Sequence, residues 1–99
     1  MTTTTTATTT TTQTVPRPAD HVRTLIEDGT AVLLDMRRGR YLGLDEVATR
    51  IWRLLEAGTA EHEIVRSLVD AYGADPETVR SDLAAFLAQC RRRELLAPA

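Results

Sequence analysis

The stretch GTAVLLDMRRGRYLGLD, residues 29–45, decides the fold. It contains two short runs, Ala31–Asp35 and Arg40–Leu44, and each has the length and composition of a β-strand. The Arg38-Gly39 pair between the runs and the Asp28-Gly29 pair before them are typical of the tight turns that join antiparallel strands. The stretch therefore predicts at least one antiparallel hairpin.

A further strand is predicted to begin at Val22, because Val22, Thr24 and Ile26 alternate with the residues between them. The three strands form an antiparallel meander in which residues 40–44 lie at the edge. Leu33 lies opposite Leu42 if the last turn has four residues, and opposite Leu44 if it has two.

Both turns give the same two faces of the sheet. The face predicted to pack on the core holds Ala31, Leu33, Leu42 and Leu44. The opposite face holds Val32, Leu34, Tyr41 and Gly43. That second face is too apolar for solvent alone, so we expect a neighbour or a ligand to cover part of it.

After Asp45 the apolar spacing becomes helical and predicts three helices. Asp45, Thr59 and Asp75-Pro76 are the expected helix starts, and Gly58 and Gly73 the expected ends. The expected apolar stripes are Val47, Ala48, Ile51, Leu54 and Leu55, with Trp52 at the flank, then Ile64, Val65, Leu68, Val69 and Tyr72, then Val79, Leu83, Phe86, Leu87 and Cys90.

The order of elements, βββααα, predicts a small α+β domain with a three-stranded antiparallel meander followed by three helices. The short turn between the last two helices, next to a hairpin, is typical of a winged-helix-like domain. Leu95-Leu96 is expected to fold back on the core. We assign residues 20–97 to the domain and residues 1–19 to a disordered Thr-rich tail with an extended lead-in.

Composition excludes several classes of function. The chain has 99 residues and a net charge of −2, which argues against a general nucleic-acid or anionic-membrane binder. Its basic residues are all Arg, which suggests a GC-rich, bacterial coding sequence. One Cys and two His make an internal disulfide or a zinc site a poor expectation. With no membrane-length apolar run and no secretion signal, a soluble cytoplasmic protein is expected.

Catalytic motifs are missing as well: the sequence has no Gly-rich phosphate loop, no metal-ligand spacing and no nucleophile motif. Cys90 lies on the apolar stripe of the third helix and is read as a core residue, so a Cys90–His62 catalytic pair has little support. His21 and His62 are read as plain surface residues. We therefore expect no catalysis and no cofactor.

Helix-turn-helix spacing makes a DNA-binding regulator the alternative from another class. The third helix would then be the recognition helix, yet its first turns carry Asp75, Glu77 and Asp82, which repel phosphate. Arg80 is a weak counterweight, and Arg91–Arg93 lie at the far end of the helix. Nucleic acid is therefore the less favoured partner.

A peptide is the favoured partner. The edge strand 40–44 has no proline or lysine to block further pairing, and Gly43 permits close approach of another backbone. A peptide strand added there can send alternate side chains toward the apolar side of the third helix.

The same residues show a family resemblance. Gly29–Asp35, Arg38–Tyr41 and Leu44-Asp45 resemble the strand, turn and helix start of the PqqD-like proteins, with Asp45 where Asn is common. The resemblance extends over about residues 20–96 through Ile51–Leu55, Gly58-Thr59, Ile64-Val65, Tyr72-Gly73, Asp75-Pro76 and Leu95-Leu96.

The resemblance implies a RiPP recognition element, a domain that binds the leader segment of a ribosomally made precursor peptide. The leader backbone would pair with Arg40, Tyr41, Leu42, Gly43 and Leu44. A side-chain pocket would use Tyr41, Leu42, Val79, Leu83 and Phe86, and Arg80 and Asp82 would read leader charges.

A free-standing chain of this size, with this strand and turn pattern, resembles most the leader-binding protein of lasso-peptide biosynthesis. Its partners would be a transglutaminase-like leader peptidase and a macrolactam-forming cyclase. The competing resemblance is to the peptide chaperone of pyrroloquinoline quinone biosynthesis, which serves a radical-SAM enzyme.

Overall fold

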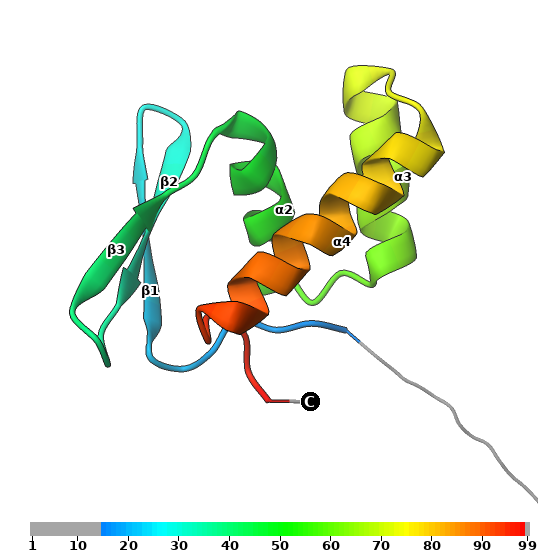
Figure 1. Cartoon of the computed structure of the whole chain (residues 1–99). Helices are drawn as coiled ribbons and strands as arrows, with labels where there is room; N and C mark the ends of the chain where they lie inside the picture. Colours follow the sequence, from blue (N-terminus) through cyan, green and yellow to red (C-terminus); the bar gives the residue numbers. More distant parts are fainter. Residues whose placement is uncertain (1–14, 99) are drawn as a thin grey trace, which may run out of the picture.

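The computed structural model describes residues 15–98, so most of the predicted Thr-rich tail lies outside the described residues. Three strands are followed by three helices (Figure 1), which confirms the predicted α+β order. The elements are β1 (Val22–Glu27), β2 (Thr30–Asp35), β3 (Arg40–Gly43), α2 (Glu46–Glu56), α3 (Glu61–Tyr72) and α4 (Pro76–Arg92).

The sheet is an antiparallel meander in the order β1-β2-β3. The β1–β2 turn has positive φ at both central residues, 52° at Asp28 and 83° at Gly29, as a tight hairpin of the right twist requires. Leu33 lies opposite Leu42. Of the two predicted registers, the one with the four-residue turn is therefore the observed one, and β3 is an edge strand.

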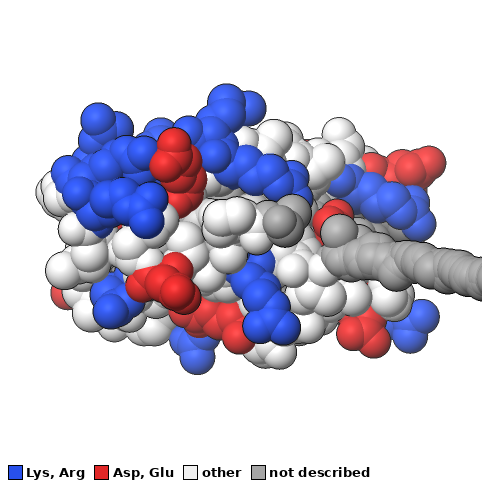
Figure 2. Space-filling view, turned by 90° about the horizontal axis from the view of Figure 1, so that it is seen from below, with Lys and Arg blue, Asp and Glu red and all other residues white. Residues whose placement is uncertain are grey.

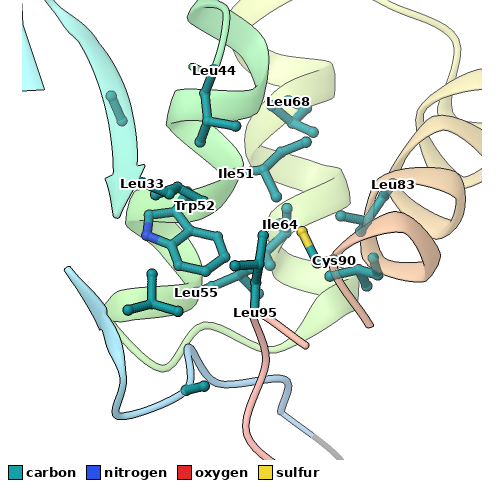
Figure 3. Packing of buried hydrophobic residues seen from close by; sticks show 14 of the residues in the cluster. Leu33, Leu44, Ile51, Trp52, Leu55, Ile64, Leu68, Leu83, Cys90 and Leu95 are labelled. Atoms are coloured by element: carbon teal, nitrogen blue, oxygen red, sulfur yellow. The ribbon is translucent and has the colours of Figure 1, made fainter. Parts of the chain in front are cut away.

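The two faces of the sheet divide as predicted. On the face that the helices cover, Ala31, Leu33 and Leu44 are buried (Figure 3). On the opposite face Tyr41 is 77% exposed and Leu25 is 53% exposed. All three helices lie on one side of the sheet (Figure 1), so the core forms a single layer between sheet and helices.

Helix α2 begins with the predicted cap, since the Asp45 carboxylate accepts from the Ala48 amide at 2.8 Å. The predicted buried stripe is wrong at two positions: Trp52 is 0% exposed, whereas Val47 is 43% exposed. The buried face is rotated toward Trp52 because α2 also packs on the sheet. There the buried Thr49 hydroxyl accepts from the Ala31 amide at 2.9 Å.

The start of α3 corrects a second prediction. The N-cap residue of α3 is Ala60 and not Thr59, and no side chain forms a capping hydrogen bond there. The Thr59 amide instead donates to the Leu54 carbonyl at 3.0 Å, so Thr59 still belongs to the turn that ends α2. Gly73 ends α3 in the left-handed conformation, as predicted.

Helix α4 starts as predicted, with Asp75 accepting from the Thr78 amide at 3.1 Å and Pro76 in the first turn. After α4 the chain folds back on the core as predicted, and Leu95 is only 4% exposed there. Its carbonyl accepts from the Ala19 amide at 2.9 Å, and Leu96 pairs with Pro18. This pairing joins the two ends of the described chain below the core (Figure 1).

Across residues 15–98, no helix combines the length and the apolar character that a membrane crossing would need.

Candidate functional site

The edge of the sheet at β3 presents backbone groups that β2 does not use. The Leu44 amide donates to the Ala31 carbonyl at 2.8 Å. In an antiparallel ladder every second residue bonds to the same neighbour, so Leu42 and Arg40 share this side with Leu44. Tyr41 and Gly43 therefore direct their N–H and C=O groups to the open edge, where another strand can pair.

Beside this edge lies a hollow of about 380 Å³ between β3 and the C-terminal end of α4. We call it the β3 hollow. Its apolar lining comes from three leucines, two of which are buried in the core. Its lining residues are Leu33, Asp35, Arg38, Arg40, Tyr41, Leu42, Arg92, Arg93 and Leu95.

Four arginines give the β3 hollow a basic rim. Figure 2 shows basic side chains gathered at one end of the face seen from below, although the net charge of the chain is −2. Within residues 15–98 the arginines that form salt bridges are Arg38, Arg53 and Arg80. Arg40, Arg92 and Arg93 therefore keep their charges free for a ligand.

Arg38 is held by two carboxylates. Its Nη2 lies 2.7 Å from Glu94 Oε1 and its Nη1 lies 3.5 Å from Asp35 Oδ2. The hydrogen bond that Arg38 donates to Glu94 raises the pKa of Arg38 and lowers the pKa of Glu94. Arg38 thus links the β2–β3 turn to the turn after α4, and both segments contribute residues to the lining of the β3 hollow.

Asp35 organises the turn at the end of β2. Burial opposes ionisation of its carboxyl, but the amides of Arg38 and Arg37 and the Arg38 side chain donate to it and lower its pKa overall. The hydrogen bonds from the backbone amides of Arg38 and Arg37 to Asp35 Oδ1 are 3.1 Å and 3.0 Å long. An ionised Asp35 therefore fixes the backbone that leads into β3.

His21 is not the plain surface residue that was predicted. Its side chain is 15% exposed, and Nε2 lies 2.9 Å from the Glu94 carbonyl and 3.9 Å from Asp35 Oδ1. The sequence does not reveal this position, because His21 and Glu94 are far apart along the chain and meet only when the two ends pair.

The predicted site residues of β3 lie at the hollow or next to it. Arg40, Tyr41 and Leu42 line it, and Gly43 continues the open edge. Leu44 comes after the end of β3 and is buried in the core at 7% exposure.

The predicted site residues of α4 lie elsewhere. Val79 and Leu83 are buried, and Phe86 is half-buried against the core. Arg80 and Asp82 are exposed, and Arg80 pairs with Glu77 at 3.3 Å. None of these five lines the β3 hollow, so their contact with a peptide stays a prediction.

Sequence reasoning missed the α4 side of the hollow. That side is formed by Arg92 and Arg93, followed by Leu95. The signal was present as the triplet Arg91–Arg93, which the sequence places at the far end of the third helix without indicating that it faces the sheet. Arg91 lines a second hollow, between the two terminal segments.

Cys90 is buried at 0% exposure, which confirms its place in the core. Burial raises the pKa of its thiol to about 11, partly offset by Arg93 and Arg91. A thiol in this environment is a weak nucleophile. In residues 15–98 no group of three His, Cys, Asp or Glu side chains is arranged to hold a metal ion.

The fold and the site define a class: a small α+β module with an open strand edge beside a basic hollow. The chain belongs to the PqqD family, coenzyme PQQ synthesis protein D, which matches residues 30–96. None of the curated proteins compared with the chain matches it.

Two solved structures have the same fold. One is TbiB1 in complex with the TbiA(beta) leader peptide, with 40% identity and a TM-score of 0.81 over 84% of this chain and 96% of that chain. The other is lasso peptide synthetase B1 complexed with the leader peptide, with 24% identity and a TM-score of 0.80 over 86% and 100%. The second supports the fold alone.

Proposed function

We propose that this chain binds the leader segment of a ribosomally synthesised precursor peptide and presents it to maturation enzymes. The leader adds to β3 as a further strand. The observation that carries this proposal is the open edge of β3, where Tyr41 and Gly43 offer unused backbone groups next to the β3 hollow.

The family supports the same conclusion. A relative that is 40% identical, over 96% of its length, is described in complex with a leader peptide. The two folds are similar, with a TM-score of 0.81 over 84% of this chain, which supports a peptide as the ligand of this chain too. The partner is therefore a peptide in extended conformation rather than a small molecule.

The chain acts in this proposal by binding and not by catalysis. The one cysteine is buried with a raised pKa, so it is poorly suited to nucleophilic attack. The chemical steps belong to separate partners: a transglutaminase-like leader peptidase, and a macrolactam-forming cyclase that acts after it.

The test is a fluorescence-anisotropy titration of the full chain with the labelled leader of the precursor peptide encoded beside it. Saturable binding is expected. Gly43→Pro removes the outward N–H and should weaken binding by about tenfold or more, since a ladder bond is lost and the proline ring obstructs pairing.

Gly43→Ala is the matched control. An added Cβ at Gly43 meets no atom within 4 Å, and the outward N–H is kept, so affinity should stay close to that of the unsubstituted chain. Equal affinity of the folded Gly43→Pro and Gly43→Ala variants would exclude β3 as the docking edge. Absence of leader binding by the unsubstituted chain would refute the function itself.

Presentation to the peptidase is tested separately. The rate of leader removal by the purified peptidase should rise when the chain is added and should fall again with Gly43→Pro. An unchanged cleavage rate, with leader binding intact, would contradict the presenting role.

The family match also favours a second candidate, a peptide chaperone for a radical-SAM enzyme in pyrroloquinoline quinone biosynthesis. Co-purification separates the two. Stable association with a radical-SAM enzyme rather than with the peptidase would favour the chaperone. The leader peptide bound by TbiB1, which is 40% identical to this chain, and the fold shared with lasso peptide synthetase B1 together make the lasso-peptide role the first choice.

A further inference from the structure

We propose that the β3 hollow binds a carboxylate side chain of the added strand through Arg40, Arg92 and Arg93. The chain thereby selects leaders in which an acidic residue stands two positions after an apolar one. This inference rests on the proposed strand addition and names the peptide chemistry that the site recognises.

The first support is the charge of the hollow. Arg40, Arg92 and Arg93 line it and take part in none of the salt bridges found in the described residues. Three guanidinium groups around one hollow repel each other, and an entering carboxylate relieves that repulsion. Arginine is also well suited to this ligand, because its planar fork can bind both carboxylate oxygens.

The position of Arg92 and Arg93 at the C-terminal end of α4 increases the dependence of anion binding on their charges. The C-terminal end of a helix carries partial negative charge on its free carbonyls and disfavours an anion. An acidic ligand at this place therefore depends on Arg92 and Arg93 to outweigh the helix dipole. Replacing them should cost more affinity than removing an ordinary surface charge.

The second support is the register of β3. Arg40 and Leu42 are two residues apart, so they lie on the same face of the strand, and Leu42 faces Leu33 in the neighbouring strand. In an added strand, the residues opposite Leu42 and opposite Arg40 point to this face as well. One of them meets apolar Leu42 and the other meets Arg40.

The order of the two peptide residues follows from strand direction. The sheet is antiparallel, and antiparallel pairing is the more stable mode. In an antiparallel added strand the residue opposite Leu42 precedes the residue opposite Arg40 by two positions. The expected pattern in the leader is therefore apolar, any residue, acidic.

A nucleic-acid phosphate fits the hollow less well than a carboxylate side chain. Asp35 lines the hollow and Glu94 binds Arg38 beside it, so these two carboxylates repel the closely spaced phosphates of a nucleic acid more than they repel a single carboxylate. The leucines in the lining also favour a ligand with an apolar neighbour. A side chain carried on a peptide strand meets both conditions.

The test on the protein compares two doubly substituted full-length chains in the same leader titration. Arg92→Gln with Arg93→Gln removes two charges from the hollow. Arg66→Gln with Arg91→Gln removes two charges from the same chain, and neither of these residues lines the hollow. We expect about a tenfold loss of affinity for the first pair, and less than about twofold for the second.

The test on the peptide replaces each acidic residue of the leader singly by its amide, Asp by Asn and Glu by Gln. One replacement, two positions after an apolar residue, should reproduce the loss seen with the Arg92 and Arg93 substitutions. Combined with those substitutions it should cause little further loss, because both changes remove the same interaction.

The outcomes separate this inference from the proposed function. Leader binding that depends on Gly43 but responds equally to both arginine pairs would overturn the inference and leave the function standing. Coupling at an acidic residue in another position would overturn the proposed pattern. Binding of a labelled DNA duplex that depends on Arg92 and Arg93, with no leader binding, would overturn both.

Discussion

Arg38 Nη2 lies 2.7 Å from Glu94 Oε1, and this ion pair holds the turn before β3 against the turn after α4. The two residues are 56 positions apart in the sequence. Because both turns contribute residues to the lining of the β3 hollow, the ion pair acts on the shape of the site as well as on stability.

Glu94→Gln should therefore lower the melting temperature by a few degrees at neutral pH, and the difference from the unsubstituted chain should shrink in acid. The pKa of Glu94 is held below its ordinary value of 4.5, so its contribution is complete above that pH. It is lost as the pH falls through the lowered pKa. Melting curves between about pH 7 and about pH 3 test this. A difference that grows in acid would contradict the assignment.

Trp52 gives a second prediction, on stability. Its indole N–H donates to the Thr24 hydroxyl at 3.0 Å, and that hydroxyl donates to Glu56 at 2.8 Å. Thr24→Val keeps the shape but leaves the indole donor without its partner, which should cost about 1–3 kcal/mol. Urea unfolding followed by the emission of the single tryptophan measures the change. Thr24→Ser retains the hydroxyl and is the control, expected to lose less.

The sheet could be predicted from the sequence almost in full, because each of its features is local. Residues close together in the chain decide the alternation of side chains along each strand and the tight turn at Asp28-Gly29. They also decide that Leu33 and Leu42 lie on the same face of the sheet. The helix ends at Gly58 and Gly73 are local signals too, as are the caps Asp45 and Asp75.

The errors and omissions come from long-range packing. Trp52 was placed at the flank of its helix because the apolar stripe cannot tell that the sheet covers the neighbouring face. His21 was predicted to be a plain surface residue because its contact with Glu94 depends on the pairing of the two ends of the chain. The lining that β3 gives to the β3 hollow includes the predicted residues Arg40, Tyr41 and Leu42, whereas the lining from α4 depends on the angle between helix and sheet.

Cys90 gives a third prediction, on reactivity. The folded chain should react only slowly with a disulfide reagent at about pH 8, because burial raises the thiol pKa to about 11 from the ordinary 9.0. The reaction should accelerate in parallel with unfolding as urea is added. Fast labelling of the fully folded chain would show that Cys90 is accessible, contrary to its 0% exposure.

Phe86 gives the last prediction, because the structure places it half-buried against the core while the family resemblance assigns it to the peptide pocket. Phe86→Ala should destabilise the fold by about 2 kcal/mol, less than a fully buried phenylalanine. If Phe86 also touches the leader, affinity should fall beyond what the unfolded fraction explains. Phe86→Leu retains most of the apolar surface, so it should lose less stability and less leader affinity than Phe86→Ala. Titrations at a temperature where all three chains are folded separate the two roles. A leader affinity that is equal in the three folded chains would make Phe86 a core residue only, and would confine the peptide site to β3 and the C-terminal end of α4.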